Sequence, residues 1–568
     1  MRVKKSVSKN STSLSVIKSV RINGKNTSKV VEALGSLEEI IIKSNGMDPF
    51  EWAKNRAKEL TDLESKKESD TLVKFSVSKL LDYDNPTLFN CGYLFIQKLY
   101  YLLNIDKLCF DISKNYKFDY DLNSILSSLV YSRIIYPASK LSTLKLSKNF
   151  LEQSKFDLHH IYRALDVLAE NSFDIQTHLY NASKDIVDRN SSILYYDCTN
   201  YFFEIEEASG LKQYGKSKEN RPNPIVQMGL FLDGNGIPLA FNINPGNTNE
   251  QTTLQPLEKQ IIKDFELSKL VVCTDAGLSS NSNKKFNSIA NRAYITTQSL
   301  KKLKNHLRDW ALDPSGFKVS GSSKVINIFE DELDYHKTYY KERWINENGL
   351  EERLIVSYSP KYQQYQSNIR EKQIDRAIKK ISNGKRKTKN PNDFDRFIKE
   401  CNVTAEGEVA QTSILSLDEE AIEKESQYDG FYAMVTNLED DINDIIYVNQ
   451  RRWEIEETFR IMKSEFKARP VYLQKDNRIE AHFLICFISM VIFRILEKQL
   501  DEKYSAEKII EKLKEMNVYK IPGEGYIPVY TRDEISDKLH EISEFRTDYQ
   551  IVKDKKAKEI IKKIKGKK

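Results

Sequence analysis

Along the first residues of the chain, polar and apolar positions alternate by twos and then change to a helical spacing. Residues 13–20 and 28–31 alternate as strands do, and Asn23-Gly24 between them is a strong hairpin signal. Helical spacing follows between residues 37 and 63. We therefore predict that residues 1–85 form a small basic β and helical module, which either binds DNA or caps the fold.

Residues 86–190 carry apolar side chains at helical intervals. Leu122, Ile125, Leu126 and Leu129 follow the i, i+3, i+4, i+7 spacing of one helix face. We predict a helical domain here. Its expected role is support of the fold, and it is also a candidate for DNA binding.

The pattern changes to strands at residue 193. An apolar run at 193–197 ends in Asp197, and a second run at 270–275 ends in Asp275. Between them the sequence predicts two further strands around the turn at 233–236 and a helix near 254–262, and a helix and a short strand follow Asp275. Three antiparallel strands, a helix, a strand, a helix and a strand are the order expected of an RNase H-like core, whose first part we place at residues 191–300.

The rest of the chain is predicted to interrupt and then complete this core. Mixed strand and helix patterns at residues 301–430, with a basic Gly- and Pro-punctuated linker at 383–395, indicate a β-rich insertion domain. The second part of the core follows at residues 431–500, where one long helix is expected to start near residue 441 and to run through Met462. Residues 501–568 are predicted to be helical and basic.

Composition limits the class of protein. The 568 residues are 40% hydrophobic, which supports three or four domains with a sizeable core. The apolar run Phe483–Phe493 is too short to cross a bilayer, and the N-terminus has no apolar signal segment, so a cytoplasmic, nucleoid-associated protein is expected. The six cysteines are scattered without metal-ligand spacing, and no phosphate-binding GxxxxGK[ST] loop occurs.

The positions of the charged residues along the chain are more informative than the net charge of +6. Arg2 to Lys29 contains eight basic residues and no acid, and Lys553 to Lys568 contains nine lysines against two acids. A third basic cluster is Lys385–Lys389. Each cluster alone is equally explained as solvated surface, but three together favour contact with a nucleic-acid backbone.

Asp197 and Asp275 are the first candidates for chemistry. Each follows a buried-strand pattern, where an aspartate can also serve as a turn or helix-capping residue. If the two strands are neighbours, both carboxylates emerge at one edge of the sheet and repel each other unless a cation lies between them. Mg²⁺ prefers such oxygen ligands and completes its shell with water and substrate phosphates.

A third acid is expected from the helix that follows residue 441. The candidates are Glu454, Glu456, Glu457 and Glu465. Arg452, Glu456 and Lys463 share one helix edge, because they are separated by four and seven residues. A solvated face with an Arg–Glu ion pair would give the same pattern. His482, on the apolar stretch 479–498, is interpreted as a core histidine.

Three segments resemble the DDE transposases of bacterial insertion sequences, in the IS-four-like superfamily. They are Tyr195–Phe202 around the first Asp, Val271–Gly277 around the second Asp, and Arg452–Lys463, which is similar to the family's Y-x2-R-x3-E-x6-K signature. The Tyr position of that signature is Asn449 here, and the nearest tyrosine is Tyr447. Gly215–Lys218 and Arg221-Pro222 also resemble family features.

The resemblance implies a function and the residues that perform it. Asp197, Asp275 and Glu456 would be the catalytic residues and the ligands of two Mg²⁺ ions, with Mn²⁺ as a substitute, and Arg452 and Lys463 would contact DNA phosphates. The enzyme would cleave double-stranded DNA at terminal inverted repeats and join the ends to target DNA, as a homodimer in a synaptic complex.

Two other functions remain open at this point. An RNase H-like nuclease could use the same three acids without strand transfer, although the insertion and the Arg–Glu–Lys edge argue against it. A non-catalytic DNA-binding protein derived from a transposase is the other alternative, and the presence of all three acids argues against it.

Overall fold

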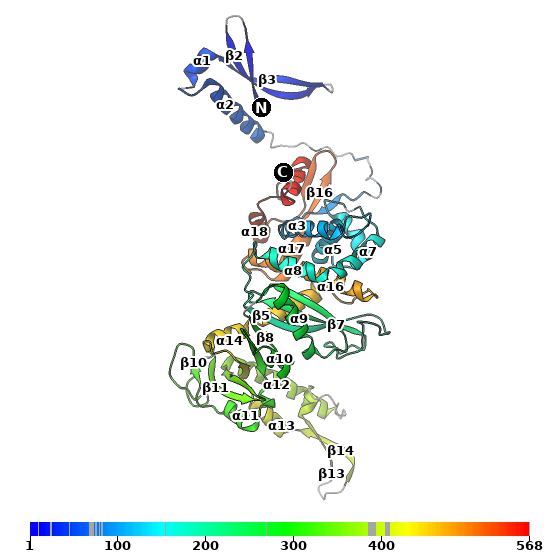
Figure 1. Ribbon diagram of the computed structural model, residues 1–568, viewed down its shortest axis with the longest axis vertical. Helices are drawn as coiled ribbons and strands as arrows, with labels where there is room; N and C mark the ends of the chain where they lie inside the picture. The colour runs from blue at the N-terminus through cyan, green and yellow to red at the C-terminus, as the bar shows by residue number, and fades with distance from the viewer. Residues whose placement is uncertain are drawn as a thin grey trace. The chain divides into compact units, whose positions relative to one another are not determined.

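A computed structural model of the chain describes its 568 residues except 9–10, 23–24, 45, 68–72, 74–76, 79, 81–82, 84, 154, 268–269, 384–392, 404–408 and 567–568. The predicted hairpin turn Asn23-Gly24 and the basic cluster Lys385–Lys389 lie outside the described residues. The chain forms two compact units, Met1–Asn85 and Pro86–Lys568 (Figure 1).

The first unit is a small antiparallel sheet with two helices. Its strands, in the order β1-β2-β3, are β1 (Arg2–Val7), β2 (Thr12–Ile22) and β3 (Lys25–Ser36), and its helices are α1 (Leu37–Lys43) and α2 (Pro49–Lys67). Ser36 begins α1 with a reciprocal pair of hydrogen bonds to Glu39, the capping box that an S-x-x-E sequence predicts. Leu14 and Val16 of β2 pack against α1 and α2, so the predicted β unit followed by helices is confirmed.

A nine-stranded mixed sheet is the centre of the second unit. Its order is β10-β11-β12-β15-β9-β8-β5-β6-β7. The strands are β5 (Ile193–Phe202), β6 (Ile225–Asp233), β7 (Pro238–Pro245), β8 (Leu270–Thr274), β9 (Arg292–Gln298), β10 (Lys318–Val319), β11 (Tyr339–Glu347), β12 (Leu350–Tyr358) and β15 (Phe431–Thr436). Strands β5, β6 and β7 are antiparallel, whereas β8 and β9 continue parallel to β5. With α9 (Leu254–Asp264) and α10 (Asn281–Phe286) between the later strands, this is the element order predicted from the sequence.

Strands β11 and β12 do not form a sheet of their own. The sequence analysis placed them in an insertion domain, but β12 pairs with β15, and β15 pairs with β9 of the core. Alternation within a strand shows that it is half-buried but not which strand it pairs with. The remaining elements of this stretch are α11 (Asn305–Leu312), α12 (Pro360–Ser382), β13 (Ile398–Val403), β14 (Val409–Leu417) and α13 (Glu419–Ser426).

The predicted helical region is observed as six α-helices that share one core with the sheet. They are α3 (Tyr93–Leu102), α4 (Ile105–Ser113), α5 (Leu122–Ile135), α6 (Lys140–Leu146), α7 (Leu158–Glu170) and α8 (Ser172–Ser183). Helix α16 (Asp476–Gln499) lies between these helices and the strands (Figure 1) and stacks Phe487 against Phe241 of β7. Although α16 is long and apolar enough to span a membrane, 94% of its most apolar window is buried inside the fold.

The last residues differ from the predicted helical region. Helices α17 (Ala506–Glu515), α18 (Glu534–Ser543) and α19 (Asp554–Ile564) alternate with β16 (Asn517–Ile521), β17 (Gly525–Pro528) and β18 (Val552–Lys553). These strands form a four-stranded sheet with β4 (Leu88–Asn90), which precedes the first helix of the unit. Strands of two to five residues are too short to give a clear alternating pattern, which is why only helices were expected here.

Candidate active site

Asp197 lies in the middle of a strand rather than at its end. The sequence analysis ended the strand at this acid, but β5 continues to Phe202 because each of its residues from Leu194 to Phe202 pairs with β6. Side chains alternate between the two faces of a strand. Tyr196 and Cys198 contact Thr253, which precedes α9, so Asp197 points to the opposite face.

Asp275 lies beside Asp197 on the neighbouring strand. Strands β5 and β8 are parallel, and Tyr195 is the register partner of Cys273. Asp197 lies two residues beyond this pair on β5, and Asp275 directly follows the last residue of β8. The two carboxylates are close enough for Asp275 to raise the pKa of Asp197, in addition to the larger effect of burial.

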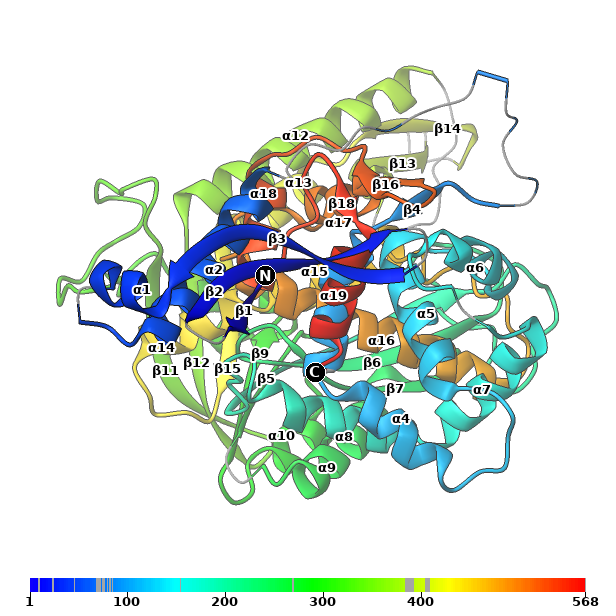
Figure 2. The same cartoon turned by 90° about the horizontal axis from the view of Figure 1, so that it is seen from above.

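Helices α14 (Ile442–Gln450) and α15 (Trp453–Ser464) cover this face of the sheet. The Tyr195 hydroxyl donates to the Val448 carbonyl of α14 at 3.0 Å, whereas Tyr201 contacts the sulfur of Met462 at the end of α15. The junction between the two helices therefore lies over Asp197, which stands between these tyrosines on β5. Figure 2 shows α15 and α16 on one side of the strands and α9 and α10 on the other.

The prediction of one long helix from residue 441 is wrong, because the segment is divided at Arg451 and Arg452. Here the hydrogen bonds span three residues instead of four, as from Arg452 N–H to the Asn449 carbonyl at 3.3 Å. Glu454 is buried, forms an ion pair with Arg451 and packs on Gly236 in the turn between β6 and β7. Contacts of this kind come from the tertiary structure, so the helical spacing gave no sign of the break.

Of the four candidate acids from α15 and the residue after it, Glu456 remains the candidate for a catalytic role. Glu454 is used in packing, and Glu457 pairs with Arg460 and Arg494. Glu465 follows the last residue of the helix and accepts a hydrogen bond from Ser464. The Glu456 side chain is 61% exposed, and among the described residues it pairs only with Arg452, at 3.5 Å.

Arg452 connects Glu456 to the two strands. Burial raises the pKa of Asp197 to about 6 and that of the Cys273 thiol to about 12, and the nearby Arg452 guanidinium offsets part of both increases. The three carboxylates are nevertheless not clustered. Within the described residues, only Asp157, His159 and His160 bring three ligand atoms within 4.8 Å of one another. That exposed group is a helix cap, since the His160 ring accepts from the Asp157 N–H.

Two lysines border the carboxylates. Lys463 donates to the Thr199 hydroxyl of β5 at 2.5 Å, and its pKa is lowered to about 8 by burial and by the nearby Lys218, against the opposing effect of Asp197. Lys218, on the loop between β5 and β6, donates to the Cys198 carbonyl and lies 3.5 Å from Glu250. The sequence analysis gave Lys218 no role; its place in the Gly215–Lys218 segment was the available signal.

Asn449 occupies the position of the signature tyrosine. It is buried, and its amide donates to the Tyr432 hydroxyl of β15 at 3.2 Å. That hydroxyl in turn shares a 2.6 Å hydrogen bond with Thr297 of β9. Tyr447, the nearest tyrosine in the sequence, is exposed instead. The phenol of Tyr432, which lies on β15 and 17 residues before Asn449, therefore borders the site.

The two aspartates fit a divalent cation. The pKa of Asp197 is raised to about 6, chiefly by burial and also by Asp275, while Lys218, the Cys198 N–H and Arg452 act to lower it. Each carboxylate accepts one hydrogen bond from the backbone, Asp197 from Cys198 and Asp275 from Leu278. Neither forms an ion pair within the described part of the chain, so oxygen lone pairs remain for a hard cation such as Mg²⁺.

A large part of the chain, including most of this site, matches a known protein family. The family described as "Transposase DDE domain" matches residues 202–492, slightly more than half of the chain, a range that includes Asp275 and Glu456 and begins after Asp197. No curated protein matches the sequence.

Two solved structures are distantly similar. A piggyBac transposase synaptic complex with hairpin DNA is 10% identical over 83% of this chain and 88% of that chain, with a TM-score of 0.35. A Mos1 transposase paired-end complex is 12% identical over 42% of this chain and 65% of that chain, with a TM-score of 0.13. Both similarities are too low to support an argument about this chain.

Proposed function

Because the chain belongs to the family of transposase DDE domains, we propose that it is an insertion-sequence transposase of the IS-four-like superfamily. It would cut DNA at the ends of its element and join these ends to target DNA. The observation that supports the proposal is the proximity of Asp197 on β5 to Asp275, which follows the neighbouring parallel strand β8, and to Arg452, which precedes the helix of Glu456 and Lys463. The surrounding strands β5 to β9 have the order expected of an RNase H-like core.

Asp197, Asp275 and Glu456 would hold two Mg²⁺ ions, with Mn²⁺ as a substitute. When bound, such ions supply Lewis-acid activation of the attacking oxygen and stabilise the leaving oxygen at phosphorus. Glu456 would have to exchange its ion pair with Arg452 for the metal. That exchange is inexpensive, because an exposed pair at 3.5 Å contributes little stability.

The cations of the site would position the DNA strand. Arg452, released from Glu456, can grip a phosphate with two parallel N–H donors, whereas Lys463 acts as a point charge held by Thr199. Lys218 lies beside Lys463 and adds a second positive charge on the same side of Asp197. Positioning and charge neutralisation are the main contributions that a protein makes to phosphoryl transfer.

The partners of the proposed enzyme are double-stranded DNA and a second copy of the chain. Terminal inverted repeats and target DNA would be held by a homodimer in a synaptic complex. The basic Met1–Asn85 unit and the helices α3 to α8 are the candidates for recognition of the ends. The protein would act in the cytoplasm, associated with the nucleoid.

The test is cleavage of DNA that carries the element's own ends, with Mg²⁺ or Mn²⁺. We expect Asp275→Asn and Glu456→Gln to bind this DNA and to lose about 10³-fold or more in cleavage rate. Glu465→Gln is the matched control, since this acid follows the same helix and its side chain accepts a hydrogen bond from the neighbouring Ser464. Its rate should equal that of the wild type.

Each outcome separates the alternatives. Cleavage without joining to target DNA would favour the RNase H-like nuclease. DNA binding without cleavage by the wild type would favour a non-catalytic DNA-binding protein. Cleavage by Asp275→Asn at the wild-type rate would place the catalytic site elsewhere.

A further inference from the structure

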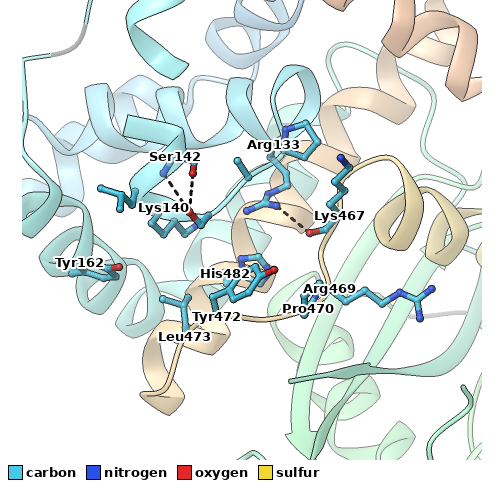
Figure 3. A pocket seen from close by; sticks show the side chains of 14 residues that line it. Arg133, Lys140, Ser142, Tyr162, Lys467, Arg469, Pro470, Tyr472, Leu473 and His482 are labelled. Atoms are coloured by element: carbon cyan, nitrogen blue, oxygen red, sulfur yellow. Dashed lines mark hydrogen bonds between the residues drawn. The ribbon is translucent and has the colours of Figure 1, made fainter. Parts of the chain in front are cut away.

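A second charged site lies in the same unit, away from the carboxylates. A cavity of about 570 Å³ is enclosed by the end of α5, the start of α6, residues 467–473 and His482 of α16 (Figure 3). Its charged lining residues are Arg133, Lys140, Lys467 and Arg469, and it has no carboxylate. A volume of this size exceeds what a few waters need and falls in the range of ligand sites.

Two of these cations are buried. Arg133 is 4% exposed and Lys140 is 6% exposed, and Figure 3 shows both side chains converging on the cavity. Arg133 donates to the Phe466 carbonyl at 2.9 Å, but its Nε has no partner within the described residues. Lys140 makes no hydrogen bond or ion pair with any described residue. Lys467, at the exposed rim, likewise forms no ion pair with a described residue.

Unpaired buried charges of one sign are costly unless an opposite charge joins them. This cost appears as lowered pKa values of the buried basic groups beside the cavity. Burial and the adjacent Arg133 lower the pKa of Lys140 to about 7, and burial with the same two cations lowers the pKa of His482 well below its usual value. His482 is therefore a neutral, buried histidine that hydrogen-bonds the Ala468 carbonyl, in agreement with its interpretation as a core residue. An anion in the cavity would compensate Arg133 and Lys140 together.

The wall of the cavity is joined to the strand that carries Asp197. Val471 N–H donates to the Phe202 carbonyl at 3.2 Å, and Arg469 extends out of the cavity to within 5.9 Å of the Phe202 ring centre (Figure 3). Arg221 lies over the same ring at 4.1 Å. Arg469 and Arg221 both form ion pairs with Glu219, so the charged side chains that follow β5 from Lys463, beside Thr199, to the cavity include one acid among the cations.

The spacing suits a chain of phosphates. From Asp197 to Phe202 the strand advances about 17 Å, which equals the rise of about five nucleotide steps along the axis of B-DNA. A free phosphate compound would need the cavity but not the cations that connect it to Asp197.

We propose that this cavity, hereafter the phosphate pocket, binds one backbone phosphate of the DNA strand whose reacting phosphate lies at Asp197 and Asp275. This inference rests on the proposed function for the identity of the ligand. The binding of phosphate itself rests only on Arg133, Lys140 and Lys467.

The first arm of the test uses inorganic phosphate and the thermal melting of the full chain. At matched ionic strength, millimolar phosphate should raise the Tm of the wild type by about 1–2 °C relative to chloride. Lys140→Met should lose this shift and should itself melt at or above the wild-type temperature, because it removes an uncompensated buried charge. Lys145→Met, an exposed lysine on the same helix, should keep the shift.

The second arm measures the affinity for duplex DNA of the element's ends as a function of salt. Lys140→Met should bind about 3- to 10-fold more weakly, and the slope of log affinity against log salt should fall by about 1, with Lys145→Met unchanged. Lys467→Asn provides a second variant in which folding is not at risk, since Lys467 is exposed and has φ +45°, a conformation that asparagine tolerates. It should show the same direction of change.

The outcomes distinguish this inference from the proposed function. If Lys140→Met and Lys467→Asn keep both the phosphate shift and the salt slope, the phosphate pocket does not exist, whether or not the wild type cleaves DNA. If the phosphate shift depends on Lys140 but the DNA slope does not, the pocket binds a free phosphate compound and the DNA assignment is overturned. If the wild type neither binds nor cuts DNA, the proposed function fails, and the first arm still decides whether the pocket binds phosphate.

Discussion

The carboxylate site and the phosphate pocket concentrate charge of opposite sign, and the fold builds them in different ways. Asp197 and Asp275 come from neighbouring strands, so the register of one parallel pair sets their separation. Arg133 and Lys140 come from the end of one helix and the start of the next, and residues 467–473 close the pocket by attaching to β5. None of these four charges forms an ion pair with a described residue, although Lys218 and Arg452 lie near Asp197. Under the two proposals above, each site would be completed by a ligand of the opposite sign: a divalent cation at the first and a phosphate at the second.

The largest effect on the carboxylate site is expected when one of its two aspartates is neutralised. Asp197→Asn should lower DNA cleavage by about 10³-fold or more, because one ligand of the proposed cations is lost. DNA affinity should be retained, since the cations of the site remain. Cleavage of labelled element ends measures the rate, and Asp174→Asn on the exposed surface of α8 is the control. An unchanged rate would remove Asp197 from the site.

A smaller effect is expected where the two sites approach each other along β5. Lys463→Met removes the charge that Thr199 holds beside Asp197 and should reduce cleavage by about 10- to 100-fold. Because Lys463 would contact a phosphate at the reacting centre, the loss should appear mainly in kcat for bound DNA. Lys475→Met, which removes an exposed charge before α16, should leave the rate unchanged. A loss confined to affinity would assign Lys463 to general DNA binding.

The acidic site should also be visible without DNA, through the pH dependence of melting. The pKa of Asp197 is raised to about 6 from 3.8, so its contribution to stability is fully present below about pH 4 and is lost as the pH rises through 6. The Tm of the metal-free wild type should therefore fall relative to that of Asp197→Asn by about 1–3 °C between about pH 5 and pH 7.5. Added Mg²⁺ should reverse the fall. A pH-independent difference between the two proteins would contradict the burial of this carboxylate.

The most delicate test asks whether the two sites are independent. In the absence of DNA, Mg²⁺ and phosphate should each raise the Tm by about 1–2 °C, and the two shifts should add. Asp197→Asn should lose only the Mg²⁺ shift, and Lys140→Met only the phosphate shift. If either substitution abolishes both shifts, the two sites are one coupled site and the comparison drawn above is wrong.

The sequence predicted the parts of this molecule that depend on local pattern. The strands that carry Asp197 and Asp275, the two helices between the later strands, and the helical region follow periodicity and were found in the expected order. The pairing of β12 with β15 could not be predicted, because alternation does not identify a partner strand. The division between α14 and α15 depends on Glu454 packing against Gly236, a contact over more than 200 residues of chain.

The candidate site shows the same limit at the level of side chains. Two acids at the ends of predicted strands could be paired in advance, and the i, i+4, i+7 spacing grouped Arg452, Glu456 and Lys463. Lys218 and Tyr432 could not be placed there, since a loop lysine and a tyrosine of a distant strand have no periodic relation to the site. The phosphate pocket was invisible in the sequence because Arg133 and Lys467 meet only through the packing of α5 on the segment after α15.

The pairing of β15 with β9 determines when the central sheet can form during synthesis of the chain. The central part of the sheet is incomplete until residues 433–436 pair with residues 295–298, and the contact between Lys463 and Thr199 forms later still along the chain. A chain still emerging from the ribosome therefore exposes the open edge of β9, where it can pair with another chain. A translation product that stops before residue 456 contains both aspartates but lacks Glu456 and Lys463, so it would not have the proposed cutting activity.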